Sequence, residues 1–161
     1  LGLTLKGKRI LVIGAGGAAR GVLRPLLSAG PTRVHVINRT ESRARQLVEQ
    51  FAHGADGRLS AGPLGSVDGA FELVINATAA SLDHAVPDIS PACIADDTTA
   101  YDMMYGKEPT AFMSWAVAHH AGAASDGLGM LVEQAAESFL LWHGVRPETG
   151  AVINLLRNSN H

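Results

Sequence analysis

The chain has 161 residues, of which 47% are hydrophobic, and it carries a formal net charge of -2 at pH 7. This length and composition suit one domain of ordinary size with a proper hydrophobic core. The nearly balanced charge, without a basic run, excludes the electrostatic pattern of a nucleic-acid-binding protein. Cys93 is the single cysteine, which excludes intrachain disulfides and a cysteine metal site. No apolar stretch has the length of a membrane span and no signal peptide is recognised, so we expect a cytoplasmic protein that binds neither membrane nor nucleic acid.

A glycine-rich turn follows the first predicted strand. The unbroken apolar run over residues 10–13 ends in glycines, and an apolar helical pattern then begins. This order is typical of a buried parallel strand, a tight turn and a helix whose free amides and dipole attract a pyrophosphate. Ala19 stands at the third glycine position of the G-x-G-x-x-G fingerprint, where alanine is a tolerated variant. The alternative is a turn without a ligand, and the residues that we expect to hold a dinucleotide are Gly14, Ala15, Gly16, Gly17 and Ala18.

The helix after the turn has apolar residues at helical spacing, which predicts packing against a sheet. Pro25 lies within this pattern, so we expect it either to kink the helix or to mark its limit. A second strand over residues 33–38 then completes a β-α-β unit.

The end of the second strand indicates which cofactor fits. NAD-binding units usually have an acidic residue here that accepts hydrogen bonds from the adenosine ribose. This chain instead has Asn38, Arg39 and Thr40, followed one helical turn later by Arg43. Guanidinium groups pair with phosphate oxygens, so these four residues favour the 2′-phosphate of NADP over NAD. The alternative is that the two arginines only solvate the start of a helix.

Later segments alternate between helical and strand patterns. Residues 53–69 are ambiguous, with a short strand near residues 58–59 and a helical turn as one reading, and residues 81–97 are expected to be a loop with a short helical turn. The remaining predicted elements are a helix over 41–52, strands over 71–78 and 98–102, a helix over 110–120, an edge strand and turn over 123–127, and helices over 128–143 and 149–157. Together these predict a Rossmann-like, three-layer α/β domain, with a doubly wound, mostly parallel sheet of about six strands and helices on both faces.

Two polar residues, Asn76 and Thr78, end the strand predicted over residues 71–78. Strand ends on this side of a doubly wound sheet face the ligand crevice. The residues therefore either contact the cofactor or only terminate the strand. His119 and His120 are adjacent, so their rings point to different faces of a helix, and we predict no metal site.

Five motifs now form a recognisable series. They are GAGGAARG over residues 14–21, NRT over 38–40, INAT over 75–78, YDMMY over 101–105 and DGLGMLVEQAA over 126–136. These motifs occur in the order seen in shikimate dehydrogenases. The chain resembles the C-terminal, NADP-binding half of that family over nearly its whole length. The resemblance implies that residues 1–161 form one NADP-binding domain.

The resemblance implies NADP-dependent reduction of 3-dehydroshikimate to shikimate, a step of aromatic amino acid biosynthesis. It places Thr78 along the cofactor, Met103 and Gly127 beside the nicotinamide, and Tyr105 and Gln134 at substrate hydroxyls. Each residue also has a simpler interpretation. Met103 fits a core position, Tyr105 fits the rim of a cleft, Gly127 fits a turn, and Gln134 fits a buried amide bonded to a neighbouring backbone group.

Two departures from the family pattern stand out. Ala79 and Ala80 replace the usual serine and glycine, so a hydroxyl contact there is lost. The catalytic lysine and its partner aspartate belong to an N-terminal substrate domain that has no counterpart here, so we predict no catalytic residue in this chain and no activity on its own. The chain begins with Leu1 rather than methionine, so we expect it to be part of a longer protein.

The last two helices, over about residues 128–161, are expected to pack toward that absent domain. Leu140, Leu141 and Trp142 would then be unusually exposed and would favour self-association, as in a homodimer. Two other functions stay open: a quinate/shikimate dehydrogenase-like paralogue, and a non-catalytic NADP-binding module.

Overall fold

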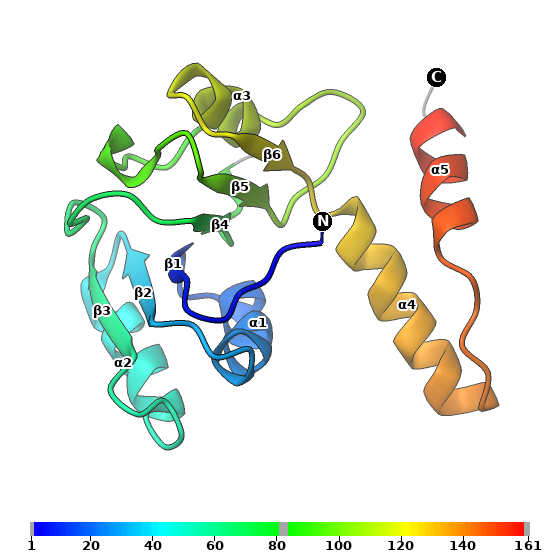
Figure 1. Cartoon of the computed structure of the whole chain (residues 1–161), viewed down its shortest axis with the longest axis horizontal. Helices are drawn as coiled ribbons and strands as arrows, with labels where there is room; N and C mark the ends of the chain where they lie inside the picture. Colours follow the sequence, from blue (N-terminus) through cyan, green and yellow to red (C-terminus); the bar gives the residue numbers. More distant parts are fainter. Residues whose placement is uncertain (1, 81–83, 160–161) are drawn as a thin grey trace.

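A parallel sheet forms the centre of the protein (Figure 1). The computed structural model describes residues 2–80 and 84–159. Within these residues the sheet has six strands in the order β3-β2-β1-β4-β5-β6, and every neighbouring pair is parallel. The strands are β1 (Arg9–Ile13), β2 (Arg33–Asn38), β3 (Leu59–Pro63), β4 (Leu73–Asn76), β5 (Thr99–Asp102) and β6 (Ala123–Ser125). This is the doubly wound strand order, so the predicted α/β fold is confirmed, with a sheet that is wholly rather than mostly parallel.

The central strand β1 is apolar on both of its faces, which explains its unbroken run of large aliphatic residues. Ile10 and Val12 belong to one hydrophobic core, and Leu11 and Ile13 belong to a second core on the opposite face of the sheet. β1 therefore separates two buried layers and pairs with β2 and β4 on either side.

Helices cover both faces of the sheet, which gives the predicted three layers. Helices α1 (Gly17–Ser28) and α2 (Glu41–Phe51) contribute buried residues to the core around Ile10. Helix α3 (Ala111–Ala118) and the short 3-10 helix η2 (Pro91–Cys93) contribute to the other core.

Most element predictions agree with the structure to within one or two residues, including the short strand that was one reading of residues 53–69. Helix α1 continues past Pro25 to Ser28, so the proline does not mark its limit. The ambiguous segment after α2 contains the edge strand β3, which begins at Leu59. η2 is the helical turn expected within residues 81–97, of which residues 81–83 lie outside the described part of the chain.

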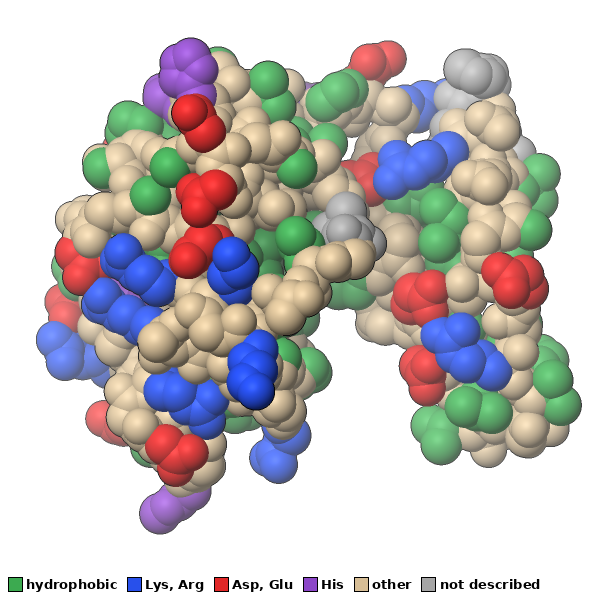
Figure 2. Space-filling view, in the orientation of Figure 1, with side chains coloured by type: hydrophobic (Ala, Val, Ile, Leu, Met, Phe, Trp, Pro, Cys, Tyr) green, Lys and Arg blue, Asp and Glu red, His purple; other side chains and the backbone are tan. Residues whose placement is uncertain are grey.

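The two C-terminal helices form a hairpin that stands apart from the layered body (Figure 2). Helix α4 (Leu128–His143) ends, as predicted, at Gly144, whose φ of 72° is left-handed. Helix α5 (Gly150–Ser159) follows. Leu141 and Trp142 are 83% and 78% exposed, which confirms their expected exposure, whereas Leu140 is half-buried.

Polar contacts hold the hairpin together. Arg146 lies in the connection and forms ion pairs with Glu133 and Glu137 of α4. The Thr149 hydroxyl donates to Glu133 Oε1 at 2.8 Å.

None of the helices described within residues 2–80 and 84–159 is long and apolar enough to cross a membrane.

A buried histidine joins the edge of the sheet to the loop after β3. His35 Nδ1 lies 2.8 Å from Ser60 Oγ, and Nε2 lies 3.1 Å from the Ser66 carbonyl oxygen. Burial, and then the charge of Arg33, lower the pKa of His35 below its ordinary value. The folded protein therefore favours the neutral imidazole.

This shift predicts a loss of stability in acid. Because the pKa of His35 is lower in the folded state, the unfolded chain binds more protons as the pH falls below about 6.5. The free energy of unfolding should then fall as the pH is lowered from 7.5 to 5.5. The slope reflects up to one extra proton that the His35 side chain binds when the protein unfolds. Urea titrations at several pH values of wild type and His35→Gln measure this, since the variant should show a shallower slope. Equal slopes would contradict the assignment to His35.

Candidate functional site

The parallel sheet brings five of the predicted site segments to one edge. Because all strands run in the same direction, their carboxyl ends meet there. The strand order reverses direction between β1 and β4, which is where doubly wound sheets form a ligand crevice. The predicted residues at or just after the ends of β1, β2, β4, β5 and β6 are, in turn, Gly14, Asn38, Thr78, Met103 and Gly127.

The turn after β1 requires glycine at its first position. Gly14 has a φ of 108°, and a Cβ there would lie 3.0 Å from the Ala77 carbonyl oxygen and 3.1 Å from Thr78 Cγ2. By contrast, a Cβ on Gly16 or Gly17 would meet nothing within 4 Å. The turn is therefore packed against β4 on one side and open on the other.

The open side of the turn leads into α1. Gly16 is the N-cap residue of this helix, so the first amides of the helix lie beside the open surface. Ala18 is exposed on the first turn, while Ala15 is half-buried and packs against the core. Such a helix start suits a bound phosphate.

Two exposed guanidinium groups lie after the end of β2. Within the residues that the structure describes, neither Arg39 nor Arg43 forms an ion pair, whereas Arg45 binds Glu41 at 2.8 Å. Thr40 occupies the N-cap position of α2, yet its side chain makes no capping hydrogen bond. Asn38 Nδ2 donates to the Thr40 carbonyl oxygen at 2.9 Å. The segment thus presents two arginines and a hydroxyl to solvent.

Met103 and Gly127 come together across the ends of β5 and β6. A Cβ on Gly127 would lie 2.2 Å from the Met103 carbonyl oxygen, and the Gly127 amide donates to the Met104 carbonyl oxygen at 2.9 Å. Gly127 is therefore more than a turn residue, because it permits this close backbone approach. Met103 is half-buried and packs against the core on the α1 face, as its simpler interpretation predicted.

The two polar residues at the end of β4 have different environments. Asn76 is wholly buried, and its Oδ1 accepts hydrogen bonds from the Thr78 amide at 3.1 Å and the Thr78 hydroxyl at 2.7 Å. Of the two alternatives left open for Asn76, this environment favours the one in which it only terminates the strand, because its side chain is used inside the protein. Thr78 is half-buried beside Gly14.

The two predicted substrate residues, Tyr105 and Gln134, are exposed. Tyr105 is 47% exposed in the loop after β5. Gln134 lies on α4, and its Nε2 donates to the Met130 carbonyl oxygen at 3.3 Å. The interpretation of Gln134 as a buried amide is wrong, although the backbone hydrogen bond is present.

Sequence reasoning missed a buried carboxylate at the same edge of the sheet. Asp102 ends β5 and is wholly buried. Its oxygens accept hydrogen bonds from Asn76 Nδ2, the Met104 amide and the Thr110 hydroxyl. An acidic residue at the end of a predicted strand was the available signal.

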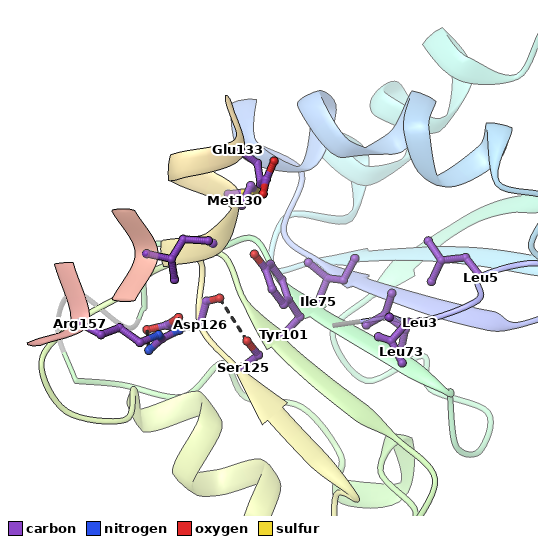
Figure 3. Close-up of a pocket in the computed structure, with 13 residues that line it drawn as sticks. Leu3, Leu5, Leu73, Ile75, Tyr101, Ser125, Asp126, Met130, Glu133 and Arg157 are labelled. Carbon is purple, nitrogen blue, oxygen red and sulfur yellow. Dashed lines mark hydrogen bonds and ion pairs between the residues drawn. The ribbon is translucent and has the colours of Figure 1, made fainter. Parts of the chain in front are cut away.

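A pocket lies between the sheet and the helical hairpin (Figure 3). This pocket of about 560 Å³ is bounded by the N-terminal segment, β4, β5, α4 and α5. Leu73, Ile75 and Tyr101 form its floor, and Asp126 and Arg157 form an ion pair at its rim, with Nη2 and Oδ1 at 2.7 Å. The floor lies on the same face of the sheet as α1 and α2, and Leu73 and Ile75 in it are buried.

Two titratable side chains are kept in their neutral forms by burial. Burial raises the pKa of the Cys93 thiol to about 11. The pKa of Tyr101 is also raised, chiefly by burial and then by the charge of Asp126. Within the described residues, no group of three or more His, Cys, Asp and Glu side chains could hold a metal ion.

Comparison with known families shows which family the chain belongs to. The sequence model of the shikimate/quinate 5-dehydrogenases matches residues 1–95, and that of the shikimate 5′-dehydrogenase C-terminal domain matches residues 127–157. The chain belongs to the shikimate/quinate dehydrogenase family.

Similar proteins extend this result. A protein of Chromohalobacter salexigens named shikimate dehydrogenase (NADP(+)) is 53% identical over 156 residues, which are 97% of this chain and 56% of the relative. One of the same name from Janthinobacterium is 55% identical over 157 residues, or 98% of this chain and 56% of the relative. The chain thus spans about half the length of these curated relatives.

Solved structures share the fold of this family member. An Ael1 enzyme from Pseudomonas putida is 42% identical, with a TM-score of 0.88 over 96% of this chain and 56% of that chain. The ligand-free 5-ketofructose reductase of a Gluconobacter strain is 27% identical, with a TM-score of 0.83 over 98% of this chain and 58% of that chain.

The close approach at Gly127 predicts intolerance of alanine. The φ of Gly127 is -82°, which alanine adopts freely, so any penalty in Gly127→Ala comes from the clash with the Met103 backbone. We expect the free energy of unfolding to fall by about 1–3 kcal/mol. The matched control is Gly129→Ala, because a Cβ there meets nothing within 4 Å and alanine should stabilise the helix by up to about 1 kcal/mol. Denaturant titrations that gave both variants the same stability would contradict the prediction.

Proposed function

We propose that this chain is the cofactor-binding half of an NADP-dependent shikimate dehydrogenase, a cytoplasmic enzyme that reduces 3-dehydroshikimate to shikimate in aromatic amino acid biosynthesis. The observation that carries the proposal is the pair of exposed guanidinium groups, Arg39 and Arg43, after β2 and next to the glycine turn after β1. The names of relatives that are 53% and 55% identical support the same cofactor and substrate.

The residues at the sheet edge fit NADP in charge and in space. The open surface over Gly16 and Gly17 has room for a pyrophosphate, with the remaining turn residues around it. At the adenosine end, no carboxylate occupies positions 38–40, and the nearby Glu41 is neutralised by Arg45. A 2′-phosphate would therefore meet positive charge without an opposing carboxylate. The residues that we assign to this end are Asn38, Arg39, Thr40 and Arg43.

The reaction divides between this chain and the rest of the proposed enzyme. NADPH supplies a hydride when it is bound. In this chain, Thr78, Met103 and Gly127 orient the nicotinamide half, and Tyr105 and Gln134 extend toward substrate hydroxyls. The proton for the forming alkoxide comes from a positioned acid. We assign that acid to a lysine paired with an aspartate in a substrate domain outside this chain.

An additional domain also accounts for apolar surface on this chain. The 560 Å³ pocket opens between the sheet and the hairpin, and the hairpin exposes Leu141 and Trp142. Because the curated relatives are nearly twice as long as the matched region, we propose that the substrate domain packs against α4 and α5. Self-association as a homodimer would cover the same side chains.

Two alternatives change the substrate or remove the chemistry. A quinate/shikimate dehydrogenase-like paralogue is supported by the family description, which includes quinate. A non-catalytic NADP-binding module would need only the turn and the arginines. Tyr105 and Gln134 favour an enzyme, because a binding module has no use for them.

Substitution of Arg39 tests the cofactor assignment. Loss of a charge-assisted hydrogen bond should weaken NADP binding by roughly tenfold or more, while NAD binding stays within about twofold. Calorimetric titration of wild type and Arg39→Ala with both nucleotides measures this. Arg24→Ala is the control, because Arg24 is equally exposed but lines a hollow at the opposite edge of the sheet. Wild-type protein that bound NAD as tightly as NADP would argue for the quinate-type paralogue.

The division of the active site predicts that this chain binds its cofactor without turnover. Without the proposed acid, NADPH oxidation by 3-dehydroshikimate should stay at the background rate even when the chain is saturated with NADPH. Calorimetry confirms saturation, and absorbance follows oxidation. Turnover by this chain alone would contradict the assignment of the acid to another domain.

A further inference from the structure

We propose that Asp102 is a positioning residue for the nicotinamide half of the cofactor site. The inference rests on the proposed NADP site, and it concerns a side chain that lies inside the protein rather than at the ligand. Asp102 holds the ends of β4 and β5 in the arrangement that places Thr78 and Met103 at the crevice.

The first observation is the set of donors around a single buried carboxylate. Asp102 Oδ1 accepts from Asn76 Nδ2 at 3.2 Å and from the Met104 amide at 3.1 Å. Oδ2 accepts from the Thr110 hydroxyl at 2.6 Å. Asp102 therefore links the end of β4, the turn after β5 and the start of α3.

The second observation is that this network continues to the glycine turn. Asn76 donates to Asp102 through its amide nitrogen, which fixes the orientation of its oxygen toward Thr78. That oxygen accepts from both the amide and the hydroxyl of Thr78. Thr78 in turn lies against Gly14, since its Cγ2 would be 3.1 Å from a Cβ there.

The third observation concerns the opposite end of the network. The Met104 amide donates to Asp102, while the Met104 carbonyl accepts from Gly127 at 2.9 Å. The same turn carries Met103, whose carbonyl approaches Gly127 closely. The carboxylate thus fixes the turn that packs against Gly127, on the side assigned to the nicotinamide.

A carboxylate is suited to this position because it only accepts hydrogen bonds. Burial of a charge is costly unless hydrogen bonds satisfy it, and here an amide, a backbone N–H and a hydroxyl all donate. An asparagine at position 102 has nearly the same shape, but an NH₂ group in place of Oδ1 would face two donors, and in place of Oδ2 it would require the Thr110 hydroxyl to turn from donor to acceptor. The Asp102→Asn variant therefore keeps the volume and breaks the pattern of acceptors.

The test compares two ligands that share the adenosine end. Adenosine 2′,5′-bisphosphate carries the 2′-phosphate assigned to the arginines after β2 and the first of the two phosphates assigned to the glycine turn, whereas NADP⁺ also occupies the nicotinamide side. We expect Asp102→Asn to weaken NADP⁺ binding about tenfold or more and to change adenosine 2′,5′-bisphosphate binding less than about twofold. Calorimetry measures both affinities, and thermal unfolding shows that the variant is folded at the titration temperature.

Two further variants complete the experiment. Asp97→Asn removes a carboxylate from an exposed loop and should alter neither affinity. Thr110→Val removes one donor to Asp102 and should weaken NADP⁺ binding selectively, and Thr110→Ser, which keeps the hydroxyl, should restore it. This pair tests the same network if Asp102→Asn does not fold.

The outcomes separate the two proposals. Equal losses for both ligands, or no loss for either, would overturn the positioning role while leaving the cofactor assignment intact. Wild-type protein that bound neither ligand would instead contradict the proposed NADP site, and with it the inference. A selective loss of NADP⁺ affinity supports both.

Discussion

The packing of the turn after β1 between its two neighbouring strands is the constraint on which the site depends. The Gly14 amide donates to the Ile37 carbonyl oxygen at 2.7 Å, and the Ala77 amide donates to the Ile13 carbonyl oxygen at 2.8 Å. These hydrogen bonds hold the turn in the plane of the sheet, so close to β4 that only glycine fits at position 14. The start of α1 is therefore fixed where the strand order changes direction.

The same geometry makes the two halves of the edge interdependent. β1 lies between β2, which leads to Arg39, and β4, which leads to Thr78. A shift in the register of β1 would displace the segments that carry Arg39 and Thr78, and it would expose aliphatic residues of both cores. The aliphatic residues of β1 and the glycine turn after it thus meet one physical requirement, which is that a buried strand ends at a fixed point.

The fold was largely predictable because its central elements have strong local signals. β2 and α4 occur over the predicted ranges. The largely apolar pattern of β2 ends in polar residues at Asn38, and the helical pattern of α4 ends at a glycine, Gly144. β3 was ambiguous because it is a half-buried edge strand of small residues. Its position depends on pairing with β2, which no local pattern encodes.

The candidate site was predictable at the level of motifs but not of side-chain environments. The glycine turn and the arginines after β2 were visible in the sequence, because both depend on residues adjacent in the chain. The role of Asn76 stayed open and the burial of Gln134 was wrongly predicted, since periodicity does not show whether a polar side chain turns inward or outward. The Asp102 network was missed because its members come from three elements that meet only in the folded protein.

The two edges of the sheet limit how copies of the chain can meet. β6 has only three residues, and β3 ends in Pro63, which has no N–H to donate. Neither edge offers a long row of unpaired backbone groups, so growth of the sheet by addition of a strand from another molecule is disfavoured. The helical hairpin, by contrast, exposes large apolar side chains such as Leu141 and Trp142.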